Sequence, residues 1–393
     1  MNETVIVSAK RTPIGSFNGT LAAVSAPKLG AVAIKSALET IALNPEHVEE
    51  VIMGNVVMAG EGQSPTRQAL LAAGLGEKTA ALTIGKVCGS GLKAVMLADQ
   101  VIRCGDASVI VAGGMENMSQ IPYVLENARN GYRLGDGKLV DLMIKDGLWD
   151  PYNNCHMGNI AEKCAAKYKI SREAQDQYAV ESYTRALSAI RDGKFKNEIA
   201  CVAIPQKKGD PVIVDTDEEP ARGKPDKLPG LKPAFDKNGT VTAGNASSIN
   251  DGAAAVVLMS RERAEQLKIK PLVKIVAQAQ VSQAPDWFTT APAAAMQKVL
   301  DKAGLKPKDI DLWEVNEAFA VVSLYNNNKL GIPADKVNVN GGAVALGHPI
   351  GASGARILVT LIHEMLKRSE AKRGMASLCI GGGEAVALII EKC

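Results

Sequence analysis

Cys88 is the first residue of this chain that could perform chemistry. It lies in the segment Lys86-Val87-Cys88-Gly89-Ser90-Gly91, directly before a predicted helix. The free N–H groups and the positive dipole end of a helix favour a thiolate over a thiol, and a thiolate is a nucleophile. The neighbouring glycines would let a reacting carbon approach the backbone closely. The alternative is a small buried hydrophobic residue at the start of a helix.

Two further candidates, His348 and Cys379, lie near the end of the chain. His348 precedes a predicted helix in the segment 347–354 (Gly-His-Pro-Ile-Gly-Ala-Ser-Gly). An imidazole beside a thiol can accept its proton, although a single histidine is more often a structural residue. Cys379 lies where a predicted strand meets Gly381 and two more glycines, whose N–H groups could bind an oxyanion. The alternative is a buried cysteine within the strand.

A fourth candidate, Asn316, precedes a predicted helix in the segment 315–319 (Val-Asn-Glu-Ala-Phe). By itself it is most simply an N-cap, whose side chain accepts a hydrogen bond from the first helical turn. Each of the four candidates is a weak signal alone. The elements that would bring them together therefore decide what they mean.

The chain repeats one pattern in its two halves. The segment 43–48 (Leu-Asn-Pro-Glu-His-Val) resembles 305–310 (Leu-Lys-Pro-Lys-Asp-Ile), and each follows an Ala-rich helical stretch. Ser90-Gly91 and Ser353-Gly354 each lead through a predicted helix to a strand that ends at a Gly-Gly pair. Such self-similarity indicates a duplicated unit, and it places Cys88 and His348 at corresponding helix starts.

Alternating strands and helices within each half predict an α/β fold. Runs rich in β-branched residues indicate strands that are mostly parallel and covered on both faces. These runs lie at 5–7, 51–52, 109–111 and 254–259. Residues 92–103 have a broad apolar face and predict a helix that ends at Gly105.

An insertion interrupts the first half, because the pattern changes between Met115 and Ala246. It contains a charged helix with Ser171 as N-cap and Gly193 as its end, followed by a Pro/Lys/Asp-rich stretch. A loop-rich segment of this length is expected to cover a ligand site, an interface, or both. We therefore expect a first half at 1–118 plus 248–270, an inserted loop domain at 119–247, and a second half at 271–393.

Composition excludes several classes of protein. With 393 residues, 46% hydrophobic and 22% charged, the chain has enough apolar side chains for a large folded core. A net charge of +3 gives no basic excess for nucleic acid. No apolar run predicts a membrane span or a leader. Seven cysteines without a CxxC pair indicate reduced thiols. We therefore expect a cytoplasmic protein or one of the mitochondrial matrix. No metal site is predicted, since the four histidines show no HExxH spacing.

Taken together and in this order, the four candidates make the chain resemble the thiolases, most closely the branch acting on acetoacetyl-CoA. The resemblance runs from Val5 to Cys393. It includes the stretches 8–15 (Ser-Ala-Lys-Arg-Thr-Pro-Ile-Gly), 113–119 (Gly-Gly-Met-Glu-Asn-Met-Ser), 156–158 (His-Met-Gly), 240–247 (Thr-Val-Thr-Ala-Gly-Asn-Ala-Ser) and 338–343 (Asn-Val-Asn-Gly-Gly-Ala). It implies the thiolase fold, a duplicated five-layered αβαβα core with an inserted loop domain.

The resemblance also implies a reaction, the reversible condensation of two acetyl-CoA to acetoacetyl-CoA and CoA. Cys88 would take the acetyl group, with His348 as its base, and Cys379 would deprotonate the second acetyl-CoA. His348 and a water held by Asn316 would form one oxyanion hole, and the N–H groups of Cys88 and Gly381 the other. No covalently bound cofactor is implied.

The same resemblance implies positions that line the pantetheine tunnel and the acyl pocket, with Arg222 near the adenosine phosphates and bulky groups that restrict the acyl chain. These positions are Leu148, His156, Met157, Arg222, Phe235, Ala243, Ser247, Phe288, Ala318 and Phe319. The segment 121–144 resembles a loop that joins dimers into tetramers, so a homotetramer is expected.

Substrate range stays open at this stage. Trp287-Phe288-Thr289 resembles the potassium-responsive branch that also accepts a 2-methyl group, whereas the Phe-Pro step of that branch is missing. Potassium binding, 2-methylacetoacetyl-CoA and longer 3-ketoacyl-CoA substrates therefore remain alternatives. Other classes are a decarboxylating ketoacyl synthase, which has histidine in the place of Cys379, and a catalytically silent acyl-CoA- or lipid-binding relative. A dinucleotide oxidoreductase is disfavoured because no GxGxxG follows the first strand.

Overall fold

The computed structural model describes residues 2–393, and its strands follow one order twice. Neighbours run β3–β5–β12–β1 in the first half and β14–β15–β16–β13 in the second. In each half the first pair is parallel and the next two are antiparallel. The predicted duplication is confirmed. The strands are β1 (Thr4–Arg11), β3 (Glu50–Gly54), β5 (Val109–Asn117), β12 (Asn250–Ser260), β13 (Val273–Ser282), β14 (Leu312–Val315), β15 (Arg373–Ile380) and β16 (Glu384–Lys392).

The two half-sheets join along a short stretch of β1 and β13, where Val5 pairs with Lys274 and Ile6 with Val273. Two short strands, β4 (Ala80–Ile84) beside β3 and β2 (Gly15–Ser16) beside β12, complete a ten-stranded sheet. A parallel bridge between Trp313 and Val337 repeats the contact of β3 with β4 in the second half.

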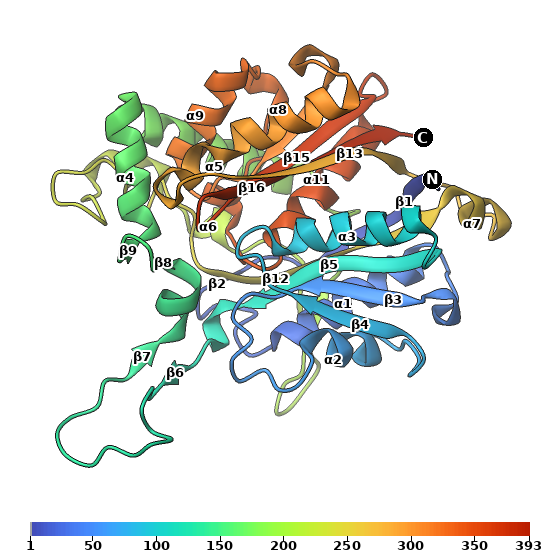
Figure 1. Cartoon of the computed structure of the whole chain (residues 1–393), viewed down its shortest axis with the longest axis horizontal. Helices are drawn as coiled ribbons and strands as arrows, with labels where there is room; N and C mark the ends of the chain where they lie inside the picture. Colours follow the sequence, from blue (N-terminus) through green and yellow to red (C-terminus); the bar gives the residue numbers. More distant parts are fainter. Residues whose placement is uncertain (1) are drawn as a thin grey trace.

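Helices separate and cover the two half-sheets, which gives five layers in the order αβαβα (Figure 1). The outer layers are α1 (Ala26–Thr40) with α2 (Pro65–Ala72), and α8 (Ala291–Ala303) with α9 (Ala320–Leu330). The central layer consists of α3 (Ser90–Cys104) and α11 (Ser353–Lys367), whose apolar side chains pack between strands of both halves. This is the fold that the sequence predicts.

The expectation of mostly parallel strands was wrong. Most neighbouring strands of the sheet are antiparallel, and only β3·β4, β3·β5 and β14·β15 are parallel. The physical reason is that burial on both faces produces a continuous apolar run whichever way the neighbour points. All residues of β5 and β12 are buried, although these two strands are antiparallel to each other.

The observed helix ends agree with the capping and terminating residues predicted from the sequence. Gly105 ends α3 in the left-handed region, with φ of 85°, and the hydroxyl of Ser171 accepts a hydrogen bond from the N–H of Ala174 at the start of α5 (Arg172–Arg191). Gly193, with φ of 67°, follows that helix. Within residues 2–393, no helix is long and apolar enough to span a membrane.

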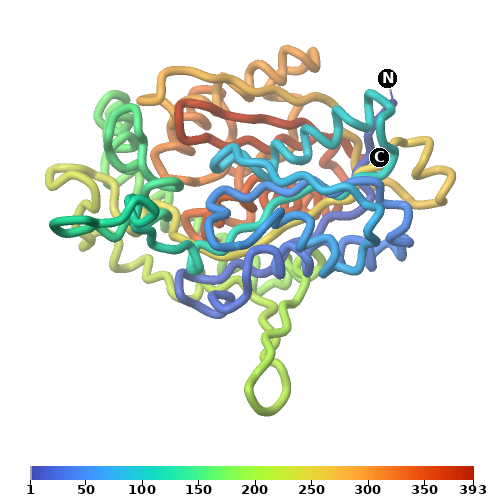
Figure 2. Tube along the Cα trace, turned by 60° about the horizontal axis from the view of Figure 1, so that its bottom comes forward, coloured from blue at the N-terminus to red at the C-terminus, as the bar shows by residue number. Residues whose placement is uncertain are grey.

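The inserted segment forms two projections and a cap over one end of the layers. A loop between β6 and β7 extends from the body (Figure 1), and the β10–β11 hairpin projects separately (Figure 2). The elements of the inserted segment are η2 (Met118–Gln120), β6 (Tyr123–Val124), β7 (Val140–Asp141), η3 (Met143–Leu148), β8 (Trp149–Asp150), β9 (Cys155–His156), α4 (Met157–Tyr168), α5, β10 (Val202–Ile204), β11 (Val212–Val214), α6 (Glu219–Arg222) and η4 (Pro225–Gly230). The remaining short elements are η1 (Pro45–His47), α7 (Arg261–Gln266), η5 (Pro285–Thr290), η6 (Pro307–Asp309), η7 (Ala334–Lys336) and α10 (Ala343–Leu346).

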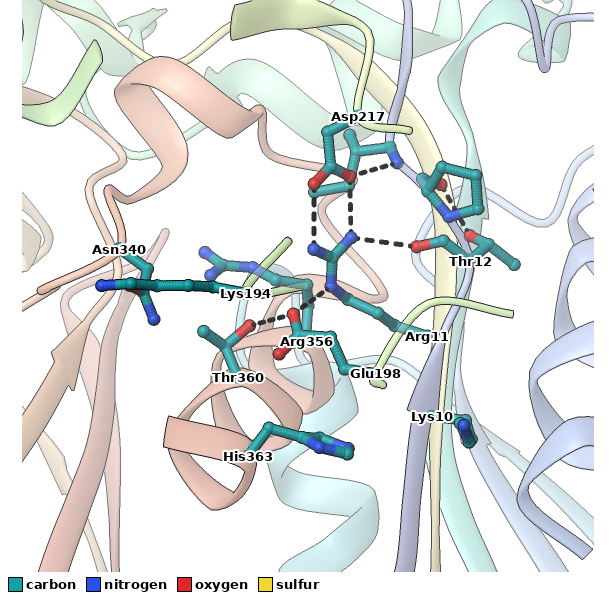
Figure 3. A network of polar contacts seen from close by, with 12 residues as sticks. Lys10, Arg11, Thr12, Lys194, Glu198, Asp217, Asn340, Arg356, Thr360 and His363 are labelled. Carbon is teal, nitrogen blue, oxygen red and sulfur yellow. Dashed lines mark hydrogen bonds and ion pairs between the residues drawn. The ribbon is translucent and has the colours of Figure 1, made fainter. Parts of the chain in front are cut away.

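Arg11 anchors the inserted segment to the core. Its fully buried guanidinium donates to Asp217 at 2.7 and 2.9 Å and to Glu198 at 2.6 Å, and Thr360 of α11 donates to Glu198 (Figure 3). Such bidentate, charge-assisted contacts offset the cost of burying the charges. The end of β1, helix α11 and the insertion are thereby held together.

Candidate active site

A tight turn between β4 and α3 presents Cys88. Val87 has φ of 45°, a strained conformation for a β-branched residue. Ser90 stabilises this turn, since its hydroxyl donates to the carbonyl of Val87 at 2.7 Å and accepts from the N–H of Lys86 at 2.8 Å. Cys88 therefore stands just before the N-cap of α3, as predicted.

Glycines allow the starts of α3 and α11 to meet. A Cβ atom on Gly91 would lie 2.8 Å from the amide nitrogen of Ala355, and one on Gly354 would lie 2.4 Å from that of Leu92. A side chain at either position would separate the helices. This contact brings the segment before α3, with Cys88, next to the segment before α11, with His348.

Cys88 and His348 line one cavity of about 500 Å³ together with Gly381. All ten positions expected to line the tunnel and pocket border this same cavity. They are Leu148, His156, Met157, Arg222, Phe235, Ala243, Ser247, Phe288, Ala318 and Phe319. Residues from both halves and from the insertion thus enclose a single space.

Cys379 lies directly behind the wall of this cavity. It is fully buried and packs in one cluster with Met157, Phe288, Ala318 and Phe319, each of which also lines the cavity. Burial raises the pKa of Cys379 well above its usual value, and the neighbouring Cys88 adds to the rise. The second thiol is therefore a neutral group in this structure and close to the first.

The pKa of Cys88 differs from the sequence-based expectation. We expected the helix end to favour the thiolate, whereas burial dominates and raises the pKa of Cys88 to about 11. The N–H groups of Gly381 and Cys88 oppose that rise. Those two N–H groups face the sulfur, as an oxyanion hole beside a reacting carbonyl would require.

His348 is neutral and has an unpartnered nitrogen. Its backbone N–H donates to Oδ1 of Asn250 at 2.9 Å, its Nδ1 lies 2.6 Å from the hydroxyl of Ser353, and its buried Nε2 has no hydrogen-bond partner among the described residues. Burial, with a contribution from Arg356, lowers the pKa of His348 to about 3. The ring is therefore uncharged at rest, and its free Nε2 can accept a proton.

Asn316 is not a helix cap. It follows β14 directly, whereas α9 begins at Ala320 with Phe319 as its N-cap. Its N–H donates to the carbonyl of Ser377 at 3.0 Å, and both polar atoms of its side chain are buried without a protein partner in the described chain. Such a group is expected to bind water or a ligand. Asn316 itself does not line the cavity.

Aromatic side chains narrow the cavity. The rings of His156 and Phe235 stack with centroids 4.7 Å apart, and Phe319 makes edge contacts with Phe235 and Phe288 at 6.2 and 6.4 Å. Nδ1 of His156 accepts from the N–H of Gly158, which fixes the ring at the start of α4. These contacts pack the rings against one another along the wall of the cavity.

Arg222 borders the cavity from the surface helix α6. Its side chain is 56% exposed and forms an ion pair with Glu218 at 3.1 Å. The guanidinium is therefore accessible at the outer part of the cavity, where a charged end of a long ligand would remain in water.

Comparison with known proteins identifies the family. The model of the thiolase N-terminal domain matches residues 4–262, and that of the thiolase C-terminal domain matches residues 269–392. The chain belongs to the thiolase family. It is 56% identical over 393 residues, the full length of both proteins, to an acetyl-CoA acetyltransferase of Cupriavidus necator. It is also 56% identical, over all of its length and 92% of the relative, to a mitochondrial acetyl-CoA acetyltransferase of Rattus norvegicus, and 54% identical over full length to one of Pseudomonas aeruginosa.

Membership of the thiolase family removes the dinucleotide oxidoreductase from consideration. Within this thiolase, several wall residues were not predicted, among them Phe17, Met118, Ile249 and Ile350. Met118 and Ile350 lie inside the motifs 113–119 and 347–354, and Phe17 and Ile249 lie just beyond the motifs 8–15 and 240–247. Apolar residues within or next to those motifs were the available signal.

Proposed function

We propose that this thiolase catalyses the reversible condensation of two acetyl-CoA molecules to acetoacetyl-CoA and CoA. The observation that carries the proposal is the single cavity in which Cys88, His348 and Gly381 meet, with Cys379 behind its wall. Relatives with this name at 52–56% identity, bacterial and mitochondrial, support the same reaction.

The first half-reaction transfers an acetyl group to Cys88. The sulfur attacks the thioester carbonyl, Nε2 of His348 takes the thiol proton, and CoA leaves as the proton passes to its sulfur. The N–H groups of Cys88 and Gly381 stabilise the oxyanion. Because the resting thiol and imidazole are both neutral, proton transfer accompanies the attack instead of preceding it.

The second half-reaction forms the carbon–carbon bond. Cys379 passes its thiol proton to Nε2 of His348 and, as thiolate, removes a methyl proton of the second acetyl-CoA. The enolate then attacks the acetyl carbonyl and displaces the sulfur of Cys88, which takes the proton back from His348. The enolate oxygen is held by His348 and by a water on Asn316, whose buried amide has no protein partner. In reverse, the same groups cleave acetoacetyl-CoA with CoA.

The outer cavity binds CoA. Leu148, Met157, Ala243 and Ser247 contact the pantetheine arm, and Arg222 meets the phosphates at the surface. The packed wall of His156, Phe235 and Phe319 limits the acyl group to a short chain.

Within residues 2–393, no three His, Cys, Asp or Glu side chains lie close enough together to form a metal site.

The loop between β6 and β7 supports a homotetramer. The loop and the adjoining strand β6 expose large apolar side chains that a monomer would leave in water, namely Tyr123, Leu125, Leu134 and Leu139 at 58%, 47%, 99% and 65% exposure. We propose that this loop joins two dimers. Multi-angle light scattering should give four chains for the intact protein, and two after Leu134 and Leu139 are both replaced by Lys.

Intact mass spectrometry tests the reaction. Acetyl-CoA should add one acetyl group to the chain and none to Cys88→Ala, whereas the exposed Cys104→Ala should be acetylated normally. Equal acetylation of Cys88→Ala and the parent would refute the nucleophile. Thiolysis rates with acetoacetyl-CoA, its 2-methyl derivative and longer 3-ketoacyl-CoA, with and without potassium, then define the substrate range.

A further inference from the structure

A second cavity, of about 690 Å³, lies away from the acyl-transfer site. It opens between β1, the end of α1, the segment 268–272 and the C-terminal part of α11, and it shares no residue with the first cavity. Its floor includes Ser8 and Lys10 of the motif at 8–15, which the proposed condensation does not use.

The wall of this cavity is cationic. Lys10, Lys268, Lys270 and Lys367 line it together with His363, and no Asp or Glu does. The whole chain is nearly balanced, with 45 Lys and Arg against 42 Asp and Glu, so the absence of acids from the wall is a local feature. Converging lysines attract a multiply charged anion.

Two of these lysines are free to bind a ligand. Lys268 and Lys270 are exposed and have no ion pair in the described part of the chain. Lys10 donates to the carbonyl of Asn197 at 2.8 Å, and Lys367 donates to the carbonyl of Lys194 and lies 4.0 Å from Glu364 of its own helix. Lys10 and His363 project from β1 and α11 beside the Arg11–Glu198 pair (Figure 3).

Ser8 provides an independent indication of a ligand. It is 1% exposed, and its hydroxyl has no hydrogen-bond partner among residues 2–393. The register of β1 against β12 shifts between Ile6 and Ser8, a bulge that redirects side chains locally. A buried hydroxyl without a hydrogen-bond partner is unfavourable unless a bound group supplies that partner.

Aliphatic side chains form the rest of the wall. Ile41, Ile269, Leu272 and Leu366 lie among the lysines, so the cavity offers both cations and an apolar surface. We propose that it binds a nucleoside diphosphate, whose phosphoryl oxygens meet the lysines and Ser8 while the base packs against the aliphatic residues. The site is separate from the cavity assigned to CoA.

Calorimetric titration of the full chain with ADP tests this site, in the presence of saturating CoA so that the first cavity is filled. Lys268→Glu/Lys270→Glu should weaken ADP binding roughly tenfold or more, because each lost ion pair is worth several-fold in affinity. Ser8→Ala, which keeps the charge, should weaken it about threefold to tenfold. The matched control Lys207→Glu/Lys208→Glu, on the exposed β10–β11 hairpin, should bind ADP normally.

Three results of the ADP titrations would overturn the proposal. They are no ADP binding by the parent, equal weakening by the two double variants, and loss of binding in Arg222→Ala with retention in Lys268→Glu/Lys270→Glu. Pyrophosphate should bind about tenfold more weakly than ADP, and equal affinity would refute a nucleotide as the ligand. A negative result in these ADP experiments has no bearing on the acetylation of Cys88. The ADP site and the proposed condensation are therefore tested separately.

Discussion

Nδ1 of His348 lies 2.6 Å from the hydroxyl oxygen of Ser353. That hydroxyl has its own acceptor, the carbonyl of Pro349 at 2.9 Å, to which it must donate. It can therefore only accept from His348, which places the ring proton on Nδ1 and leaves the lone pair on Nε2. The hydrogen bond thus selects the tautomer in which Nε2 is the base.

Ser353→Ala should lower kcat/KM about tenfold or more, the scale of one hydrogen bond that fixes a catalytic ring. The ring would then populate both tautomers and rotate more freely. Steady-state thiolysis of acetoacetyl-CoA measures the change. Ser377→Ala removes a comparable buried hydroxyl contact, to the carbonyl of Val386, and should leave kcat/KM unchanged. Equal losses in the two variants would contradict a specific role of Ser353.

Cys379→Ala should separate the two half-reactions. The variant keeps Cys88 and His348, so acetyl-CoA should still acetylate it, as seen by intact mass. Exchange of the methyl protons of acetyl-CoA with deuterated water, followed by NMR, should fall to background because the base is missing. Cys164→Ala, a buried thiol of the same cluster, should exchange normally. Normal exchange in Cys379→Ala would assign the base elsewhere.

Asn316→Ala should reduce kcat of condensation about 10²–10³-fold, since removing one donor from an oxyanion hole typically costs about 2.7–4 kcal/mol in the barrier. Acetylation of Cys88 uses the other oxyanion hole and should change much less. Quenched time courses of acetylation give the rate of the first step, and steady-state measurements give the rate of condensation. A parallel fall in both would indicate a general structural defect instead of loss of the enolate site.

The stability of the protein should depend on pH through His348. Its folded pKa, about 3, lies below the unfolded value of 6.5, so the unfolded chain binds a proton first as pH falls. This contribution is absent above about pH 6.5 and should lower the unfolding free energy by about 2 kcal/mol at pH 5. Urea unfolding at pH 7, 6 and 5 should show a smaller loss for His348→Asn. Identical pH dependence in the two proteins would refute a buried neutral ring.

Arg222→Ala should raise the KM for CoA more than the KM for pantetheine, which lacks the nucleotide. The reason is that Arg222 borders the outer cavity, away from the reacting thiols, and keeps an accessible guanidinium. Thiolysis with each thiol measures the two constants. Lys227→Ala, from the same stretch of the insertion, serves as the control. An equal change for both thiols would remove Arg222 from the phosphate site.

The sequence by itself determined the local structure and the duplication of this protein. Caps such as Ser171 and stops such as Gly105 act within one helical turn, so their neighbours in the chain are sufficient to predict them. The repeated segments before Cys88 and His348 predicted equivalent helix starts, and each does precede a central helix. Boundaries of the inserted domain remain a prediction.

Only the tertiary structure decided the direction of the strands, the surroundings of Asn316 and the protonation of Cys88. Strands buried on both faces look alike whether parallel or antiparallel. A helix does follow Asn316 in the sequence, but it begins at Ala320. The side-chain amide of Asn316 therefore caps no helix. The pKa of Cys88 follows from how much of the chain covers it, because desolvation by distant segments outweighs the nearby helix end.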